Sequence, residues 1–93
     1  MIQYDHIRCP NDAGRIPQVG QHCERPGLLV RFFWCRYCEE LFAVVGEDGS
    51  GVRVAASFSK DRQTGEWAIW KTLGNERDVE AATVALPHLG PLE

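Results

Sequence analysis

The sequence contains little that would place the protein in or across a membrane. Its longest apolar run is short, so no segment can span a bilayer as a helix. The N-terminal stretch MIQYDHIRCP carries an acid and a cysteine where a secretion signal needs an uninterrupted apolar segment. We therefore expect an intracellular, cytoplasmic protein.

Several catalytic and architectural signatures are also missing. The chain has no G-x-S-x-G element, no P-loop and no H-E-x-x-H motif, and we do not expect an enzyme. It has no internal repeat, low-complexity tract or linker. Its 93 residues make one domain at most, and 44% hydrophobic with 25% charged residues is ordinary for a globular chain.

Charge is unevenly distributed along the chain. Residues 1–38 contain five Arg and three acids, whereas residues 39–93 contain five Lys or Arg and ten acids, giving net charges of +2 and −5. The basic residues of the first segment are all Arg, which suits bidentate contact with phosphate or carboxylate. The acidic second segment repels nucleic acid unless it faces away, and it favours a basic protein partner.

Local patterns predict a small β-rich α+β fold. Residues 10–27 are rich in Pro and Gly, which excludes a helix and indicates a looped segment. Turn sequences separate four stretches of β-branched, aromatic or alternating residues, and strands are expected at 28–35, 41–46, 52–60 and 66–73. We therefore expect an antiparallel meander of three to four strands followed by a short C-terminal helix.

The strand at 52–60 alternates well, and strict alternation places four of its residues on one face: Val52, Val54, Ala56 and Phe58. Much of the core is expected from four large side chains: Phe58, Trp67, Ile69 and Trp70. After them, Asn75 is a candidate N-cap for a short helix over about 75–86 that Pro87 ends. A further strand at 82–86 is the alternative for this segment.

The four cysteines carry the clearest chemistry. Cys35 and Cys38 form a C-x-x-C pair between two expected strands, within FFWCRYCEELF. In a reducing compartment an even number of cysteines favours metal or redox chemistry over disulfides. A structural zinc ion needs four ligands in a tetrahedron, and a C-x-x-C turn directs two thiolates at one point. Cys9, near the looped segment, is the first choice for the third ligand.

Four residues compete for the fourth zinc position. Cys23 is favoured because it uses the remaining thiol, and His6 follows because it forms H-x-x-C with Cys9. His22 is adjacent to Cys23, and Asp12 completes a C-x-x-D, although carboxylates bind structural zinc less often. A closed site of this kind couples metal binding to folding, so loss of Cys35 or Cys38 is expected to unfold the N-terminal half.

The arrangement resembles the zinc-ribbon superfamily over residues 6–46, including small phage and bacterial zinc-ribbon regulators. In IRCPNDAGR, Cys9 and Pro10 fit the first knuckle of that family, although Asp12 stands where the pattern has a second cysteine. In RFFWCRYCEELFAV, the second knuckle and its strand are matched by Phe33, Trp34, Cys35, Cys38 and Phe42.

The resemblance implies one structural zinc ion beneath a small antiparallel sheet, in a module that binds nucleic acid or the transcription machinery. It also implies one zinc-ribbon-like domain over 1–93, in which 1–46 is the zinc-binding half and 47–88 a β-hairpin and short helix.

Other chemistries for the C-x-x-C pair remain open. A thioredoxin-like thiol oxidoreductase also places C-x-x-C after an apolar strand and a Trp, but it needs a strand, helix and strand around the motif. An iron–sulfur site uses four thiols too, although the spacing matches no ferredoxin pattern.

Two kinds of partner are compatible with a non-enzymatic zinc module. The first is a protein, bound by a small adaptor, regulator or inhibitor, possibilities that include the transcription machinery; no membrane is expected as a partner. The second is nucleic acid, whose phosphates and bases would be contacted by Arg15, Arg25, Arg31, Arg36, Trp34 and Tyr37. The sequence pI of about 5.6 weighs against a dedicated nucleic-acid binder.

Overall fold

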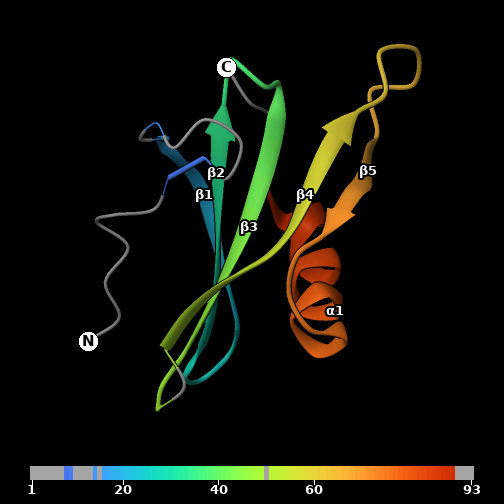
Figure 1. Cartoon of the computed structure of the whole chain (residues 1–93). Helices are drawn as coiled ribbons and strands as arrows, with labels where there is room; N and C mark the ends of the chain where they lie inside the picture. The colour runs from blue at the N-terminus through green and yellow to red at the C-terminus, as the bar shows by residue number, and fades with distance from the viewer. Residues whose placement is uncertain (1–7, 10–13, 15, 50, 90–93) are drawn as a thin grey trace.

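The computed structural model describes residues 8–9, 14, 16–49 and 51–89. They form one five-stranded sheet followed by an α-helix and a short 3-10 helix (Figure 1). The elements are β1 (Gln18–Arg25), β2 (Leu28–Cys35), β3 (Glu40–Glu47), β4 (Gly51–Lys60), β5 (Trp67–Thr72), α1 (Glu76–Ala85) and η1 (Leu86–His88). Among the described residues no helix is long and apolar enough to cross a membrane.

The sheet is an antiparallel meander in which each strand pairs with the next, in the order β1-β2-β3-β4-β5. The expected β-rich α+β class and the four expected strands are confirmed, but the expected total of three to four strands is wrong. The additional strand, β1, lies in the segment expected to be looped. Pro17 precedes it and Pro26 follows it, and Gly20 within it lies beside a shift in pairing register, so these residues do not exclude the strand.

The C-terminal helix is confirmed and the alternative strand at 82–86 is wrong. Asn75 caps α1 as expected, since its side-chain oxygen accepts a hydrogen bond of 2.8 Å from the backbone N–H of Asp78. Pro87 lies in η1, immediately after the α-helix has ended. Figure 1 shows α1 packed on one face of the sheet.

The sheet has apolar side chains on both faces. The face toward α1 carries the larger core, which includes Phe32, Leu41 and Phe58, together with Ala82 and Ala85 from the helix. The opposite face carries Phe33 and Val44, and near the β2–β3 turn it carries Cys35 and Phe42. The cysteines therefore occupy the face that the helix leaves uncovered.

The expected strict alternation of faces along β4 is wrong, because the pairing register between β3 and β4 shifts between Ala43 and Val44. Val54 pairs with Val44 whereas Ala56 pairs with Ala43, so Ala55 is an extra residue of a β-bulge. Val52 and Val54 consequently pack on the face opposite the helix, and Ala56 and Phe58 pack beneath the helix. Arg53 pairs with Val45 and lies on the helix side.

The expected aromatic core is only partly present. Phe58 is buried and Trp67 packs against the core as a partly buried side chain. Ile69 and Trp70 are instead exposed, at 44% and 61%, because β5 is the edge strand and its far side has no neighbouring strand. The expectation that these two residues form core is wrong.

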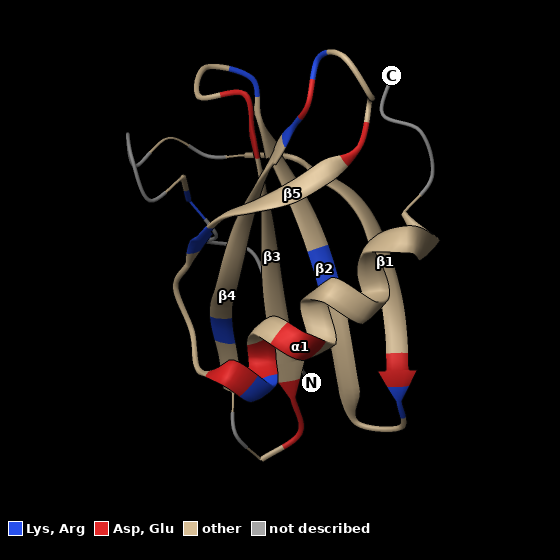
Figure 2. Ribbon diagram, turned by 90° about the vertical axis from the view of Figure 1, so that its right-hand side faces the viewer, with Lys and Arg blue, Asp and Glu red and all other residues tan. Residues whose placement is uncertain are grey.

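Charged residues fasten α1 to the sheet. The Arg53 guanidinium forms two hydrogen bonds, of 2.7 and 3.0 Å, with the carboxylate of Asp78, whose side chain is 4% exposed. The hydrogen bond with Asp78 raises the pKa of Arg53 above its usual value. Glu47 also meets Arg25 and Arg77 at 3.0 and 2.9 Å. Figure 2 shows these charged segments at the start of α1 and the adjacent strand ends.

Candidate metal centre

Three of the four cysteines come together at one end of the sheet. Cys35 is the last residue of β2, Cys38 lies in the turn to β3, and Cys9 comes from the segment before β1. Their sulfur atoms all lie within 4.8 Å of one another. Cys9 and Cys35 are buried and Cys38 is partly buried. This grouping of residues that are distant in sequence is the central feature of the site.

The spacing of the sulfur atoms suits a single metal ion. Cys9 Sγ and Cys38 Sγ are 3.5 Å apart, and all four cysteines are free thiols. Two thiolates on one tetrahedral zinc, each about 2.3 Å from the ion, lie about 3.8 Å apart. The observed separation is close to that value. Thiolate is also the donor that zinc and iron–sulfur clusters prefer.

Local backbone contacts hold the three thiols in place. The backbone N–H of Cys9 donates to the carbonyl of Gly14 at 2.8 Å, and Trp34 N–H donates to the carbonyl of Pro17 at 3.1 Å. The second contact joins the segment before β1 to β2, one residue before Cys35. Beneath the thiols, Phe42 packs against Cys9 and Cys35. Cys9 and Pro17 are therefore held against the sheet by contacts other than a metal.

The turn between Cys35 and β3 requires an unusual backbone conformation. Glu39 has a φ of 56°, the only positive value outside glycine in the part of the chain that the structure describes. This left-handed conformation lets the chain reverse immediately after Cys38 and enter β3 at Glu40. The reversal keeps Cys38 directed toward Cys9 while Glu40 pairs with Cys35 across the sheet.

The favoured fourth ligand is not part of the group. Cys23 pairs with Leu29, six residues along β2 from Cys35, which is about 20 Å at roughly 3.3 Å per residue. Its thiol is exposed and lies 3.3 Å from the carbonyl oxygen of Arg25. Because β1 runs antiparallel to β2, Cys23 is carried toward the opposite end of the sheet.

The structure also separates His22 from the three thiols. Its ring stacks on His88 of η1, with centroids 4.1 Å apart and planes 2° apart, and its Nε2 is 3.4 Å from Glu24. His6 and Asp12, the other two candidates for the fourth position, lie outside the described residues.

The five candidate nucleic-acid contacts that the structure describes do not form one surface. Arg25, at the end of β1, pairs with Glu47, and Arg31 donates to Gln18 at 3.3 Å in the middle of the sheet. Trp34, Arg36 and Tyr37 do lie beside the cysteines, with the Arg36 guanidinium 5.5 Å from the centre of the Tyr37 ring. Arg15 lies outside the described residues.

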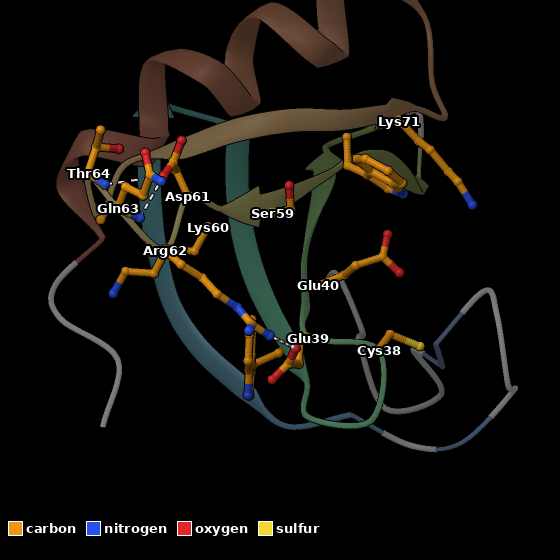
Figure 3. A pocket seen from close by; sticks show the side chains of 13 residues that line it. Cys38, Glu39, Glu40, Ser59, Lys60, Asp61, Arg62, Gln63, Thr64 and Lys71 are labelled. Atoms are coloured by element: carbon orange, nitrogen blue, oxygen red, sulfur yellow. Dashed lines mark hydrogen bonds and ion pairs between the residues drawn. The ribbon is translucent and has the colours of Figure 1, made fainter.

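Sequence reasoning missed the surroundings of Cys38. A cavity of about 980 Å³ begins there, and its lining includes the buried Glu40 and the exposed Trp70 (Figure 3). The local sequence does not indicate that these two residues line a cavity, because acids such as Glu40 are common in turns and a Trp in a strand is usually part of the core. The burial of Glu40 depends on strand pairing, and the exposure of Trp70 depends on an irregularity in β5.

No protein-family model matches the chain, and neither a curated protein nor a solved structure matches it significantly. The site must therefore be interpreted from its own geometry.

Proposed function

We propose that the protein is a non-enzymatic module built around one structural zinc ion, and that it docks on a protein partner. The observation that carries the proposal is the group of three thiols within 4.8 Å, drawn from two distant parts of the chain. Bound zinc would supply a cross-link between the segment at Cys9 and the turn at Cys38. We assign the fourth position to His6 or Asp12, each three residues from Cys9 in the sequence.

The surroundings of the C-x-x-C pair favour a structural ion over thiol catalysis. Reactive cysteines commonly lie at a helix N-terminus, which lowers the thiol pKa. Here Cys35 ends a strand and Cys38 lies in a turn between antiparallel strands, and α1 starts at Glu76 on the other face of the sheet. A thioredoxin-like oxidoreductase therefore has weaker support than a metal site.

A protein partner is supported by the outer edge of the sheet. β5 is an edge strand, and Ile69 and Leu73 beside that edge are 44% and 43% exposed. Edge strands accept an additional strand from another chain, and exposed apolar side chains stabilise such pairing. A basic partner would also meet Glu76 and Glu80, the exposed acids of α1 (Figure 2). We include in this proposal a role as a small regulator or inhibitor that binds the transcription machinery.

The zinc site is tested by elemental analysis combined with thiol titration of purified protein. We expect one zinc per chain, one thiol that reacts at once and three that react only after chelation, because Cys23 is exposed and apart from the group. Cys23→Ser should retain zinc, whereas Cys38→Ser should lose most of it. His6→Asn and Asp12→Asn then identify the fourth ligand, since the variant that loses affinity marks it.

Two results would contradict the zinc proposal. The first is protein without metal whose three grouped thiols all react as fast as Cys23. The second is retention of one zinc per chain in Cys38→Ser together with its loss in Cys23→Ser.

A further inference from the structure

The cavity beside Cys38 lies where two strands of the sheet diverge. Pairing between β3 and β4 ends at Leu41 and Phe58, while Ser59 and Lys60 continue in β4 and pair only with β5. The β2–β3 turn and the β4–β5 hairpin thus form two walls of a cavity of about 980 Å³ (Figure 3). This volume is at the upper end of the range of small-molecule sites, which is about 300 to 1,000 Å³.

Two indoles line this cavity. Trp34 is held by Trp67, whose ring meets it edge to face at 5.9 Å and 77°. Trp70 is 61% exposed. It lies between Ile69, which pairs with Phe58, and Lys71, which pairs with Ser57, and is therefore the extra residue of a bulge. Bulges redirect side chains, and this one places a large aromatic surface at the cavity and not in the core.

A buried carboxylate lies at the same cavity. Glu40 is 7% exposed, and Ser57 Oγ donates to its Oε1 at 3.4 Å. Figure 3 shows Glu40 on the same side of the cavity as Cys38 and Lys71, with Gln63 and Thr64 on the other side. The Glu40 carboxylate thus provides a hydrogen-bond acceptor in a region that is largely shielded from water.

The lining carries three cations and three acids, and two of the cations form no ion pair with a described residue. Arg62 pairs with Glu39 at 3.3 Å, and Asp61 accepts hydrogen bonds from the backbone N–H groups of Gln63 and Thr64. Lys60 and Lys71 form no ion pair with any residue that the structure describes; the Lys60 amine lies 5.9 Å from the centre of the Trp67 ring. The cavity therefore offers two unpaired cations, exposed aromatic surface and one buried acceptor.

We propose that this cavity binds a nucleotide of a single-stranded nucleic acid. The base stacks on Trp70, an amino group of the base donates to the Glu40 carboxylate, and the phosphates meet Lys60 and Lys71. A cationic side chain of a partner fits less well, because it would leave Lys60 and Lys71 without an anion. The proposal goes beyond the zinc-module proposal and requires neither an identified metal nor a protein partner.

The test measures binding of fluorescein-labelled single-stranded deoxyoligonucleotides, dC, dT and dA decamers, to the purified metal-loaded protein. We expect affinity to fall with salt with a log–log slope near −1.4, since about two phosphates are neutralised at about −0.7 each. Trp70→Ala should weaken binding about 5- to 100-fold, because base stacking on an aromatic ring is lost. Lys71→Ala should reduce the slope to about half.

Matched variants separate the cavity from the rest of the surface. Arg25→Ala removes a cation at the opposite end of the sheet and should leave binding unchanged. Oligo-dC should bind more tightly than oligo-dT, because cytosine presents an amino donor to a carboxylate, and Glu40→Gln should reduce that difference. Circular dichroism and zinc content of each variant show whether its fold is retained; Trp70 and Lys71 are exposed, so their variants should fold.

Three outcomes would overturn the proposal. The first is no oligonucleotide binding at low salt by correctly folded protein. The second is binding that Trp70→Ala leaves unchanged or that Arg25→Ala weakens as much as Lys71→Ala does. The third is quenching of tryptophan fluorescence by an arginine-rich peptide but not by oligonucleotides, which would assign the cavity to a basic protein segment.

Discussion

Arg53 and Asp78 illustrate how single residues control the position of α1. Two hydrogen bonds of 2.7 and 3.0 Å join them, and the side chain of Asp78 is nearly inaccessible to solvent. A carboxylate in such a place is destabilising unless a partner compensates its lost hydration. The net contribution of the intact pair to the free energy of unfolding is therefore smaller than the loss expected when one of its members is removed.

Removing one member of this pair should destabilise the fold. Arg53→Ala leaves the Asp78 carboxylate buried without its main partner and should lower the free energy of unfolding by about 1.5–3 kcal/mol. Because Arg53 is 31% exposed, we expect less than the loss typical of a fully buried pair. Urea denaturation measures this change, and Arg62→Ala is the control.

Arg62 pairs with Glu39, but the two side chains are 89% and 67% exposed, so its loss should change stability by less than about 1 kcal/mol. Equal losses in Arg53→Ala and Arg62→Ala would show that burial of Asp78 does not determine the contribution of the pair. Because the pKa of Arg53 is raised in the folded protein, the contribution of the pair to stability is fully present at every pH below the ordinary pKa of arginine. It is lost only as the pH rises through the still higher pKa of the folded state.

At the scale of elements, the start of α1 depends on one capping residue. Asn75 accepts the hydrogen bond from Asp78 N–H that would otherwise lack a partner inside the helix, and Glu76 and Asp78 add negative charge to the first turn. Asn75→Ala should lower the free energy of unfolding by about 1 kcal/mol. Thermal and urea denaturation provide the measurement.

Two substitutions at Asn75 distinguish capping from other causes. Asn75→Asp retains a side-chain acceptor and should preserve stability. Asn75→Gly should lower the free energy of unfolding by only about a few tenths of a kcal/mol, because Gly is tolerated at this position. If Asp and Ala are equally destabilising, the side-chain hydrogen bond contributes nothing and the capping interpretation fails.

Elements with strong local patterns could be predicted, and those that depend on pairing could not. The patterns over 28–35 and 66–73 predicted β2 and β5 to within one residue at each end, and the cap at Asn75 predicted α1. β1 was missed because Pro17, Pro26 and Gly27 dominate its flanks while its own residues carry a weak pattern. The bulge at Ala55 has no sequence signature, so the expectation that Val52 and Val54 share a face with Ala56 and Phe58 was wrong.

The same limit applies to the site. The C-x-x-C spacing and the reducing-compartment argument pointed to Cys35 and Cys38, and Cys9 was the natural third ligand. The separation of Cys23 follows from the existence of β1, whose antiparallel pairing carries that residue toward the far end of β2. Because residues 10–27 were expected to form a loop, nothing in the sequence excluded Cys23 from the metal centre.

At the scale of the whole molecule, the sheet separates two hydrophobic clusters, and only one of them includes the grouped thiols. The core beneath α1 contains Phe32, Leu41 and Phe58 and does not include the thiols. The smaller cluster on the other face joins Cys9, Cys35 and Phe42. Metal binding should therefore govern only the second cluster, whereas the sequence alone led us to expect unfolding of the whole N-terminal half.

Amide hydrogen exchange before and after chelation tests this division. Chelation should accelerate exchange at Cys9 and Trp34, whose N–H groups bond the segment near the metal centre, and at the turn that contains Cys38. Amides in the middle of β3 and β4, such as those of Ala43 and Ala56, should keep most of their protection because the helix-side core remains packed. A uniform loss of protection through all five strands would instead mean that the metal stabilises the entire fold, so the two clusters would unfold as one cooperative unit.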